Sequence, residues 1–195
     1  EKTSENAYTP VLFYSEDVHY SIQKASHLLE LPTFQQIGQE KYPGQCPITN
    51  DGSWPEMVPS HDFDKDNPKS GSVKIDKLTL LVQFFVAKSY PVVVVANIGT
   101  TWKGAYDDVP SINAMFEELG KDYPWLWERK VVYGKDEKGN PLYDIRRGFW
   151  LHVDGALGAA YLPFVEMAHN RNLLSEKGPM FDFRNPAVMS VGCSM

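Results

Sequence analysis

Three short segments carry side chains that could do chemistry, and each follows a stretch that is typical of a β-strand. They contain His19, Thr101 and Asp154, which offer an imidazole, a hydroxyl and a carboxylate. A carboxylate at the end of a buried strand must be hydrogen-bonded or paired with a cation. Of the three side chains, Asp154 therefore gives the strongest indication of a site. The segments read SEDVHYS (15–21), NIGTT continuing to GAYDD (97–108) and LHVDGA (151–156).

Each segment also has a purely structural interpretation when it is taken alone. His19 at a helix start could be solvated or structural. Residues 99–101, Gly-Thr-Thr, could form an ordinary turn. Asp154 could cap the helix that follows it. The case for function therefore depends on the three segments occurring together.

Alternating strands and helices are expected to position these segments. The run PVVVVANI at 91–98 is β-branched without alternation, as in a strand buried on both faces. Ser15, with two acidic residues after it, suits the start of a helix, and Asp76 suits the positive end of another. This order favours an α/β domain with a mostly parallel sheet, whose ligands gather at the carboxyl ends of the strands. Strands are expected at 11–14, 33–37, 91–98, 149–154 and 187–191, with helices at 17–30, at 75–86 and from about 110.

Two stretches lie outside this pattern. Residues 38–72 are rich in Pro, Gly, Asp, Asn and Ser, which predicts a long loop, and residues 121–147 are turn-rich, as in an insertion or hairpin. The long loop and the aromatic segment 123–133 could line a substrate pocket or could simply pack on the surface.

Composition limits the classes of function. The chain has 195 residues, enough for one domain, and its 43% hydrophobic and 23% charged residues are ordinary for a soluble protein. A net charge of -6 argues against a general nucleic-acid binder. The apolar runs are too short to span a bilayer. Cys46 and Cys193 are far apart, without a CxxC or His-rich neighbourhood, so we expect two free thiols in a cytoplasmic protein and no metal site.

The three motifs, in this order and at these separations, resemble those of the group II pyridoxal-phosphate-dependent amino-acid decarboxylases. The middle motif with its KGAYDD continuation is most similar to the branch of histidine decarboxylases and plant serine decarboxylases. The resemblance extends over about residues 9–195 and is weakest at 40–72, 121–147 and 169–185. It implies a three-layer α/β fold, the fold-type I large domain, and pyridoxal phosphate as the cofactor.

The resemblance also implies roles for individual residues. Asp154 would pair with the pyridine nitrogen and raise its pKa, which keeps the ring able to accept electrons. His19 would stack on one face of the ring, and Ala156 would leave room on the other. Thr101 would lie close to the cofactor. His19 and Asp154 are thus the expected catalytic residues, and the expected cofactor-binding residues are His19, Thr101, Asp154, Ala156, Ser190 and Ser194, with Ser194 near the phosphate.

By the same resemblance, the chain corresponds to a partial large domain over 1–195. The Schiff-base lysine is expected just after Met195, and a preceding segment and a C-terminal small domain are expected outside the chain. Residues 1–195 alone are therefore not expected to decarboxylate anything. The family also implies an amino-acid substrate, a homodimer and a cytoplasmic enzyme.

Three other interpretations stay open. Another fold-type I pyridoxal-phosphate lyase would share the aspartate and often the histidine. A non-catalytic relative, kept for binding or assembly, would agree with the missing lysine. A plain nucleotide-binding domain ranks lowest, because the chain has neither GxGxxG nor GxxxxGK[ST].

Overall fold

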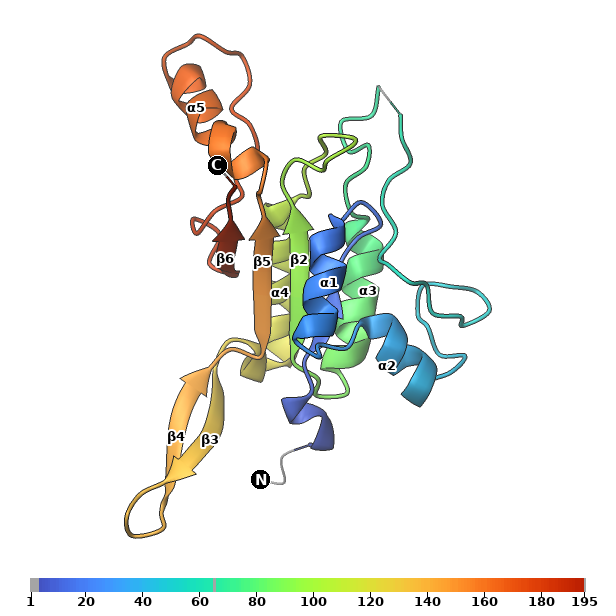
Figure 1. Cartoon of the computed structure of the whole chain (residues 1–195), viewed down its shortest axis with the longest axis vertical. Coiled ribbons are helices and arrows are strands. Elements are labelled where there is room, and N and C mark those ends of the chain that lie inside the picture. The colour runs from blue at the N-terminus through green and yellow to red at the C-terminus, as the bar shows by residue number, and fades with distance from the viewer. Residues whose placement is uncertain (1–3, 65, 195) are drawn as a thin grey trace.

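A four-stranded parallel sheet forms the centre of the computed structural model, which describes residues 4–64 and 66–194 (Figure 1). The expected mostly parallel sheet is confirmed, because each neighbouring pair of strands in it runs in the same direction. The carboxyl ends of the strands therefore lie along one edge. The strands are, in spatial order, β1 (Val11–Phe13), β2 (Val92–Asn97), β5 (Phe149–Asp154) and β6 (Val188–Gly192).

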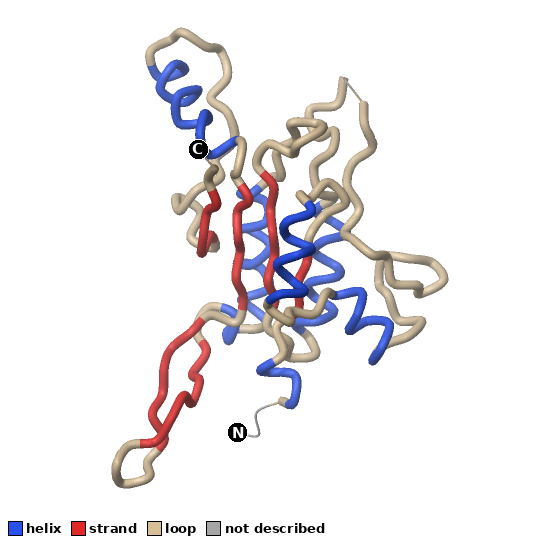
Figure 2. The backbone as a smooth tube through the Cα atoms, viewed as in Figure 1, coloured by secondary structure: helices blue, strands red, loops and turns tan. Residues whose placement is uncertain are grey.

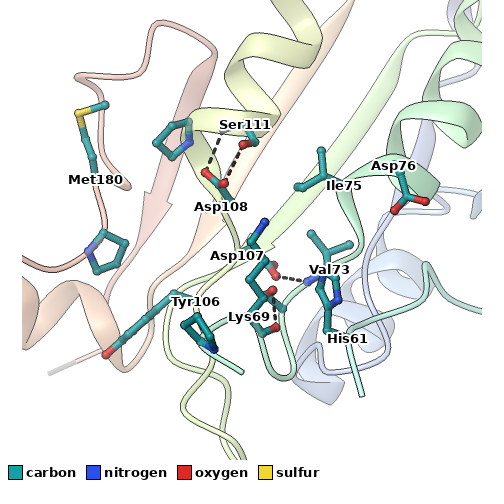
Figure 3. A pocket seen from close by; sticks show the side chains of 14 residues that line it. His61, Lys69, Val73, Ile75, Asp76, Tyr106, Asp107, Asp108, Ser111 and Met180 are labelled. Atoms are coloured by element: carbon teal, nitrogen blue, oxygen red, sulfur yellow. Dashed lines mark hydrogen bonds between the residues drawn. The ribbon is translucent and has the colours of Figure 1, made fainter. Parts of the chain in front are cut away.

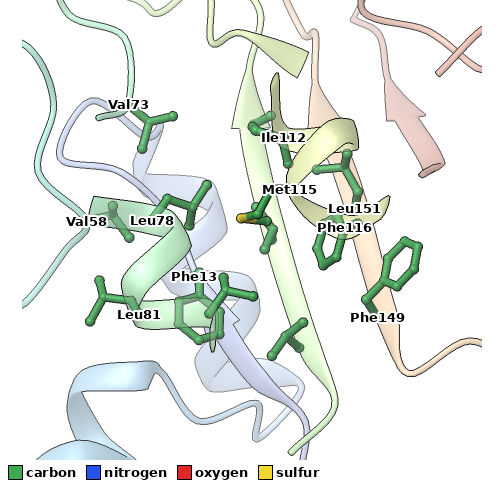
Figure 4. Packing of buried hydrophobic residues seen from close by; sticks show 14 of the residues in the cluster. Phe13, Val58, Val73, Leu78, Leu81, Ile112, Met115, Phe116, Phe149 and Leu151 are labelled. Carbon is green, nitrogen blue, oxygen red and sulfur yellow. The ribbon is translucent and has the colours of Figure 1, made fainter. Parts of the chain in front are cut away.

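Helices α3 (Ile75–Val86) and α4 (Val109–Asp122) cover one face of this sheet. Figure 4 shows their apolar side chains directed toward those of the strands. Phe116 of α4 stacks on Phe149 of β5 with ring centroids 4.1 Å apart. Each large apolar side chain buried here contributes roughly 1.5–3 kcal/mol to folding. This core fixes the strands whose ends carry the motifs.

Helix α1 (Tyr20–Leu28) covers the opposite face over β1 and β2 (Figure 1). Leu12, Tyr14 and Val95 form a second, smaller cluster there, against Val18 and Ile22. Successive residues of a strand point to opposite faces, so this cluster and the main core lie on the two sides of the sheet. The expected three-layer arrangement is confirmed.

The strand predicted at 33–37 is wrong, because residues Phe34–Lys41 form helix α2. Thr33 and Gln36 form a capping box, in which each side chain binds the backbone N–H of the other residue. The spacing Thr-x-x-Gln was the signal for a helix start that the strand prediction overlooked.

The predicted start of the first helix is also corrected. Helix α1 begins at Tyr20 with His19 as its N-cap, whereas Ser15 was expected there. Ser15 is instead buried, and its hydroxyl accepts a hydrogen bond from the side-chain amide of Asn97. It joins the ends of β1 and β2.

The stretch 121–147 contains a hairpin, as one of its two interpretations predicted. Strands β3 (Arg129–Lys135) and β4 (Pro141–Arg146) pair antiparallel and extend away from the main sheet (Figure 2). Helix α5 (Gly158–Asn170) follows β5, where a helix was expected after Asp154 without bounds, but its N-cap is Leu157 and it has no side-chain cap, so Asp154 does not cap it. Short 3-10 helices occupy Glu5–Tyr8 and Pro124–Leu126.

Three remaining expectations concern single residues or the whole chain. Cys46 is buried and Cys193 is exposed, and both are free thiols as predicted. Within the described residues, no helix has both the length and the apolar character needed to cross a membrane. Met195, after which the Schiff-base lysine was expected, lies outside the described residues.

Candidate active site

The three chemical motifs meet at the carboxyl edge of the sheet. Asn97 at the end of β2 is the register partner of Asp154 at the end of β5, so the second and third motifs are neighbours. The first motif follows β1, which pairs with the other side of β2. A cavity of about 270 Å³ lies at this edge. Its lining includes five of the six predicted residues, namely His19, Thr101, Asp154, Ala156 and Ser194.

Asp154 offers a carboxylate at this edge. Its Oδ1 accepts a hydrogen bond from the backbone N–H of Ala156 at 3.2 Å. Among the residues that the structure describes, Asp154 takes part in no salt bridge. A carboxylate in a cavity without a counter-charge of its own is suited to a cationic group of a ligand.

His19 contributes an imidazole from the start of α1. Its Nδ1 accepts a hydrogen bond from the backbone N–H of Ser21 at 3.4 Å and lies 2.8 Å from the Ser21 hydroxyl. As the N-cap, His19 is held at the start of α1, and it also lines the cavity.

The two threonines of the Gly-Thr-Thr loop have different roles. Gly99 has φ +88°, a conformation that glycine adopts without strain. The hydroxyl of Thr100 accepts from the backbone N–H of Ala105 at 3.0 Å, which closes the loop. Thr101 is exposed and lines the cavity, so its hydroxyl is accessible to a ligand.

The ends of β5 and β6 close the remaining side. The backbone N–H of Ser194 donates to the carbonyl oxygen of Ala156 at 3.2 Å, and that of Gly155 donates to Gly192 at 3.0 Å. These bonds bring Ala156 and Ser194 to the same wall.

Ser190 is the predicted site residue that the structure does not bring to this cavity. It lies within β6 opposite His152, behind the carboxyl edge. Its hydroxyl is 2.7 Å from His152 Nδ1 and accepts from Trp150 Nε1 at 2.8 Å. Cofactor binding by Ser190 stays a prediction that this geometry does not support.

Asp17 and Asn97 also line the cavity, and neither was singled out from the sequence. Both belong to the motifs that were recognised. The available signal was position, since a polar residue that ends a buried run at the carboxyl edge faces the ligand side of the sheet. A carboxylate and an amide thus join the candidate site.

A buried carboxylate, Asp107, holds the end of β2 from behind. It accepts hydrogen bonds from the backbone N–H of Val73 at 2.7 Å, from that of Asn97 at 2.6 Å and from the Asn97 side chain at 3.1 Å. Desolvation raises the pKa of Asp107 to about 6, although these donors act in the opposite direction. The second Asn97 amide proton goes to Ser15, so Asp107 and Asn97 join three segments around the cavity.

A second cavity, of about 540 Å³, lies beside the starts of α3 and α4 (Figure 3). His61, Lys69, Tyr106 and Met180 are among its lining residues. Asp108 accepts from the N–H and the hydroxyl of Ser111 there, which makes it the N-cap of α4. None of the predicted site residues lines this cavity.

The two stretches proposed as possible substrate-pocket lining do not reach the first cavity. No described residue of 40–72 or 123–133 is among its lining residues. Tyr123, Trp125 and Trp127 pack against the main core, which agrees with the packing alternative for them, while Tyr133 is exposed on the hairpin.

Comparison with known proteins gives the same family as the motifs. No family model matches the chain. The chain is 25% identical over 158 residues to a histidine decarboxylase of Vibrio campbellii, covering 81% of this chain and 27% of that protein. The chain thus spans about a quarter of the length of this relative.

Solved structures extend the similarity to the fold. L-methionine decarboxylase from Streptomyces sp. 590, in a complex with 3-methylthiopropylamine, matches with a TM-score of 0.82 and 42% identity, over 93% of this chain and 37% of that one. A sphingosine-1-phosphate lyase of Burkholderia pseudomallei shares the fold, with a TM-score of 0.54 and 21% identity over 96% of this chain and 28% of the lyase. In its motifs, its relatives and its fold, the chain is similar to the group II pyridoxal-phosphate-dependent amino-acid decarboxylases.

Proposed function

We propose that the protein containing this chain removes CO2 from an L-amino acid, with pyridoxal phosphate bound at the carboxyl edge of the sheet. One observation carries the proposal. A single cavity is lined by His19, Thr101, Asp154, Ala156 and Ser194, which come from four separate segments.

The groups in this cavity fit the cofactor. Asp154 forms no salt bridge among the described residues, so its carboxylate can accept a hydrogen bond from a protonated ring nitrogen. His19 offers a flat ring, and Ala156 offers little bulk. Thr101 and Ser194 offer hydroxyls, which suit the oxygens of a phosphate.

Pyridoxal phosphate supplies an electron sink that accepts the electron pair left when CO2 departs. The task of the chain is to keep that sink protonated and correctly oriented. Asp154 holds a proton on the ring nitrogen by opposite-charge pairing. His19 would restrain the plane of the ring, and the hydroxyls of Thr101 and Ser194 would donate hydrogen bonds to the cofactor.

Two substrate classes lead the proposal. The V. campbellii relative is a histidine decarboxylase, and the middle motif is most similar to that branch. The solved relative with 42% identity is an L-methionine decarboxylase, which favours an unbranched apolar side chain as the second candidate. A homodimer in the cytoplasm completes the proposal.

The test is a decarboxylation assay on the complete protein, with and without added pyridoxal phosphate. Histidine, methionine, an aromatic amino acid, glutamate and serine form the panel, and both the CO2 and the amine are measured. We expect amine from histidine or methionine only when the cofactor is present. Size-exclusion chromatography of the same sample tests the dimer.

Two outcomes would contradict the proposal in different ways. Tight cofactor binding without amine from any amino acid would favour the non-catalytic interpretation. Failure to bind pyridoxal phosphate at all would reject the assignment of the cavity.

A further inference from the structure

An ion pair joins two of the loops that form the candidate site. Nζ of Lys103 lies 2.9 Å from Oδ1 and 3.0 Å from Oδ2 of Asp17, so both carboxylate oxygens are engaged. The Asp17 side chain is 13% exposed and that of Lys103 is 29% exposed. Such partly buried pairs are less screened by water and salt than surface pairs.

The carboxylate of this pair belongs to the cavity itself. Asp17 lines the cavity together with Asp154, and neither lysine nor arginine is among the described lining residues. Asp17 also lies close enough to the buried Asp107 to raise the pKa of that carboxyl, as a smaller cause after desolvation. Three carboxylates therefore gather at this edge, and Lys103 is the counter-charge of one of them.

The backbone of a third loop fixes the position of the Lys103 stem. A Cβ atom on Gly71 would lie 2.6 Å from Lys103 Cδ and 3.3 Å from its Cβ. The Lys103 side chain therefore packs directly against the backbone of Gly71, which has no side chain. Gly71 also has φ +76°. The ammonium group is directed to Asp17 by packing as well as by charge.

The two carboxylates have opposite effects on the proposed cofactor. The charge of Asp154 favours the protonated ring nitrogen. An unpaired charge on Asp17 would repel the phosphate of the cofactor and the carboxylate of an amino acid, because like charges in a partly dry cavity interact strongly.

We propose that Lys103 is a positioning residue that neutralises Asp17 inside the cofactor cavity and ties the loop bearing His19 to the loop bearing Thr101. The pairing leaves Asp154 as the one uncompensated carboxylate among the described lining residues. This inference rests on the proposed function, since it concerns the same cofactor.

The experiment measures equilibrium binding of pyridoxal phosphate to the complete protein by fluorescence quenching. Lys103→Met should weaken binding by about fivefold or more, since it leaves Asp17 unpaired. The double variant Asp17→Asn with Lys103→Met should bind within about twofold of the wild type, because no charge is left unpaired. Lys103→Arg should retain most of the affinity.

Salt gives a readout that a purely structural role would not produce. Raising the ionic strength from about 0.01 M to 1 M shortens the screening length from about 30 Å to 3 Å. The difference in affinity for pyridoxal phosphate between the wild type and Lys103→Met should become smaller as the ionic strength rises over this range. Lys121→Met is the matched control, since it breaks an exposed ion pair with Glu118 and should leave binding unchanged.

The outcomes separate this inference from the proposed function. If the wild type does not bind pyridoxal phosphate, the proposed function fails. If it binds and Lys103→Met binds equally well, only the inference is overturned. If the double variant is as weak as Lys103→Met, Lys103 acts on the cofactor directly and neutralisation of Asp17 is rejected. If Lys103→Met does not fold, the double variant still decides, since the proposal requires it to bind normally.

Discussion

At the scale of single residues, the proposed chemistry depends on the charge of Asp154. Asp154→Asn keeps the size of the side chain and an oxygen for the Ala156 N–H, but it removes the negative charge. We expect turnover to fall by about a hundredfold or more, because the ring nitrogen then loses the partner that keeps it protonated. Steady-state kinetics on the preferred amino acid, with cofactor content checked, measure this effect.

A matched control lies on the hairpin. Asp144 is a half-exposed carboxylate paired with Arg146, and no residue of its strand lines the cavity. Asp144→Asn should therefore retain wild-type turnover. Wild-type turnover in Asp154→Asn would show that this carboxylate is not the partner of the pyridine nitrogen.

His19 has two roles that a pair of variants can separate. It caps α1 through Nδ1 and offers a ring to the cavity. His19→Asn retains a capping side chain without a flat ring, whereas His19→Phe retains a ring without the cap. If stacking is the role, kcat should fall more in the asparagine variant, with KM changing less than kcat.

The cap is followed separately by the free energy of unfolding. Loss of the cap in His19→Phe should cost about 1 kcal/mol, measured by denaturant titration. His27→Ala, an exposed histidine in the last turn of the same helix, is the control for both measurements. Equal kcat values in all three variants would reject stacking.

The sequence predicted most of the site because residue type and strand order are sufficient to place motifs at one edge. His19 and Thr101 follow β1 and β2, Asp154 ends β5, and these three strands prove to be neighbours. Ser190 lies opposite His152 inside β6, as the predicted strand 187–191 implied, so its expected role came from the resemblance and not from its position.

At the scale of elements, Asp107 couples the end of β2 to the loop before α3. Its pKa in the folded protein is raised from 3.8 to about 6, mainly by desolvation. Folding therefore favours the protonated carboxyl, and the stability that this proton supplies is present below about pH 4 and lost as the pH rises to about 6. The change amounts to roughly 3 kcal/mol at most.

The test compares the wild type with Asp107→Asn, which cannot titrate. The free energy of unfolding of the wild type relative to the variant should fall between about pH 4 and pH 6 and then stay constant. Denaturant titrations at several pH values measure this difference in the free energy of unfolding. The contributions of the other carboxylates are common to both proteins and cancel in it. A difference that does not change with pH would contradict the raised pKa.

Gly158 sets the contact between α5 and Ile98, the residue that follows β2. Its N–H donates to the Ile98 carbonyl oxygen at 2.9 Å, and a Cβ at this position would lie 2.4 Å from that oxygen. Gly158→Ala must therefore move α5 away, and we expect it to cost about 1–3 kcal/mol of stability. Leu157 lines the cavity beside it, so cofactor affinity should fall as well.

Gly134 in the hairpin provides the matched control. Its added Cβ would meet only Leu142 Cδ1, at 4.0 Å, so Gly134→Ala should change stability by less than about 0.5 kcal/mol. Equal stability of the two alanine variants in a denaturant titration would contradict the close packing of α5.

The elements were predictable where their patterns were long and unlike one another. The β-branched run of β2 and the apolar face of α3 gave correct assignments. The eight residues of α2 were too few for a helical period to stand out, and only the capping box marks them. Helix α5 was expected after Asp154 only without bounds, because Gly158 at its start and Pro163 inside it are weak helix formers.

At the scale of the whole molecule, the hairpin β3–β4 lies apart from the body that carries the site (Figure 1). No described residue between 129 and 147 belongs to the main core. Val132, Tyr143 and Ile145 share one face of the hairpin, and all three are exposed. A two-stranded hairpin is at best marginally stable by itself, so it should contribute little to the stability of the body.

We therefore expect the body to fold without the hairpin. Lys130 and Ile145 are register partners, so an Asn-Gly turn can join them in place of residues 131–144. The free energy of unfolding and the affinity for pyridoxal phosphate should then stay within about 1 kcal/mol of the wild-type values. Phe149→Ala, which removes a buried ring, should by contrast cost about 3–5 kcal/mol. A comparable loss on shortening the hairpin would mean that its apolar face is covered in the complete protein.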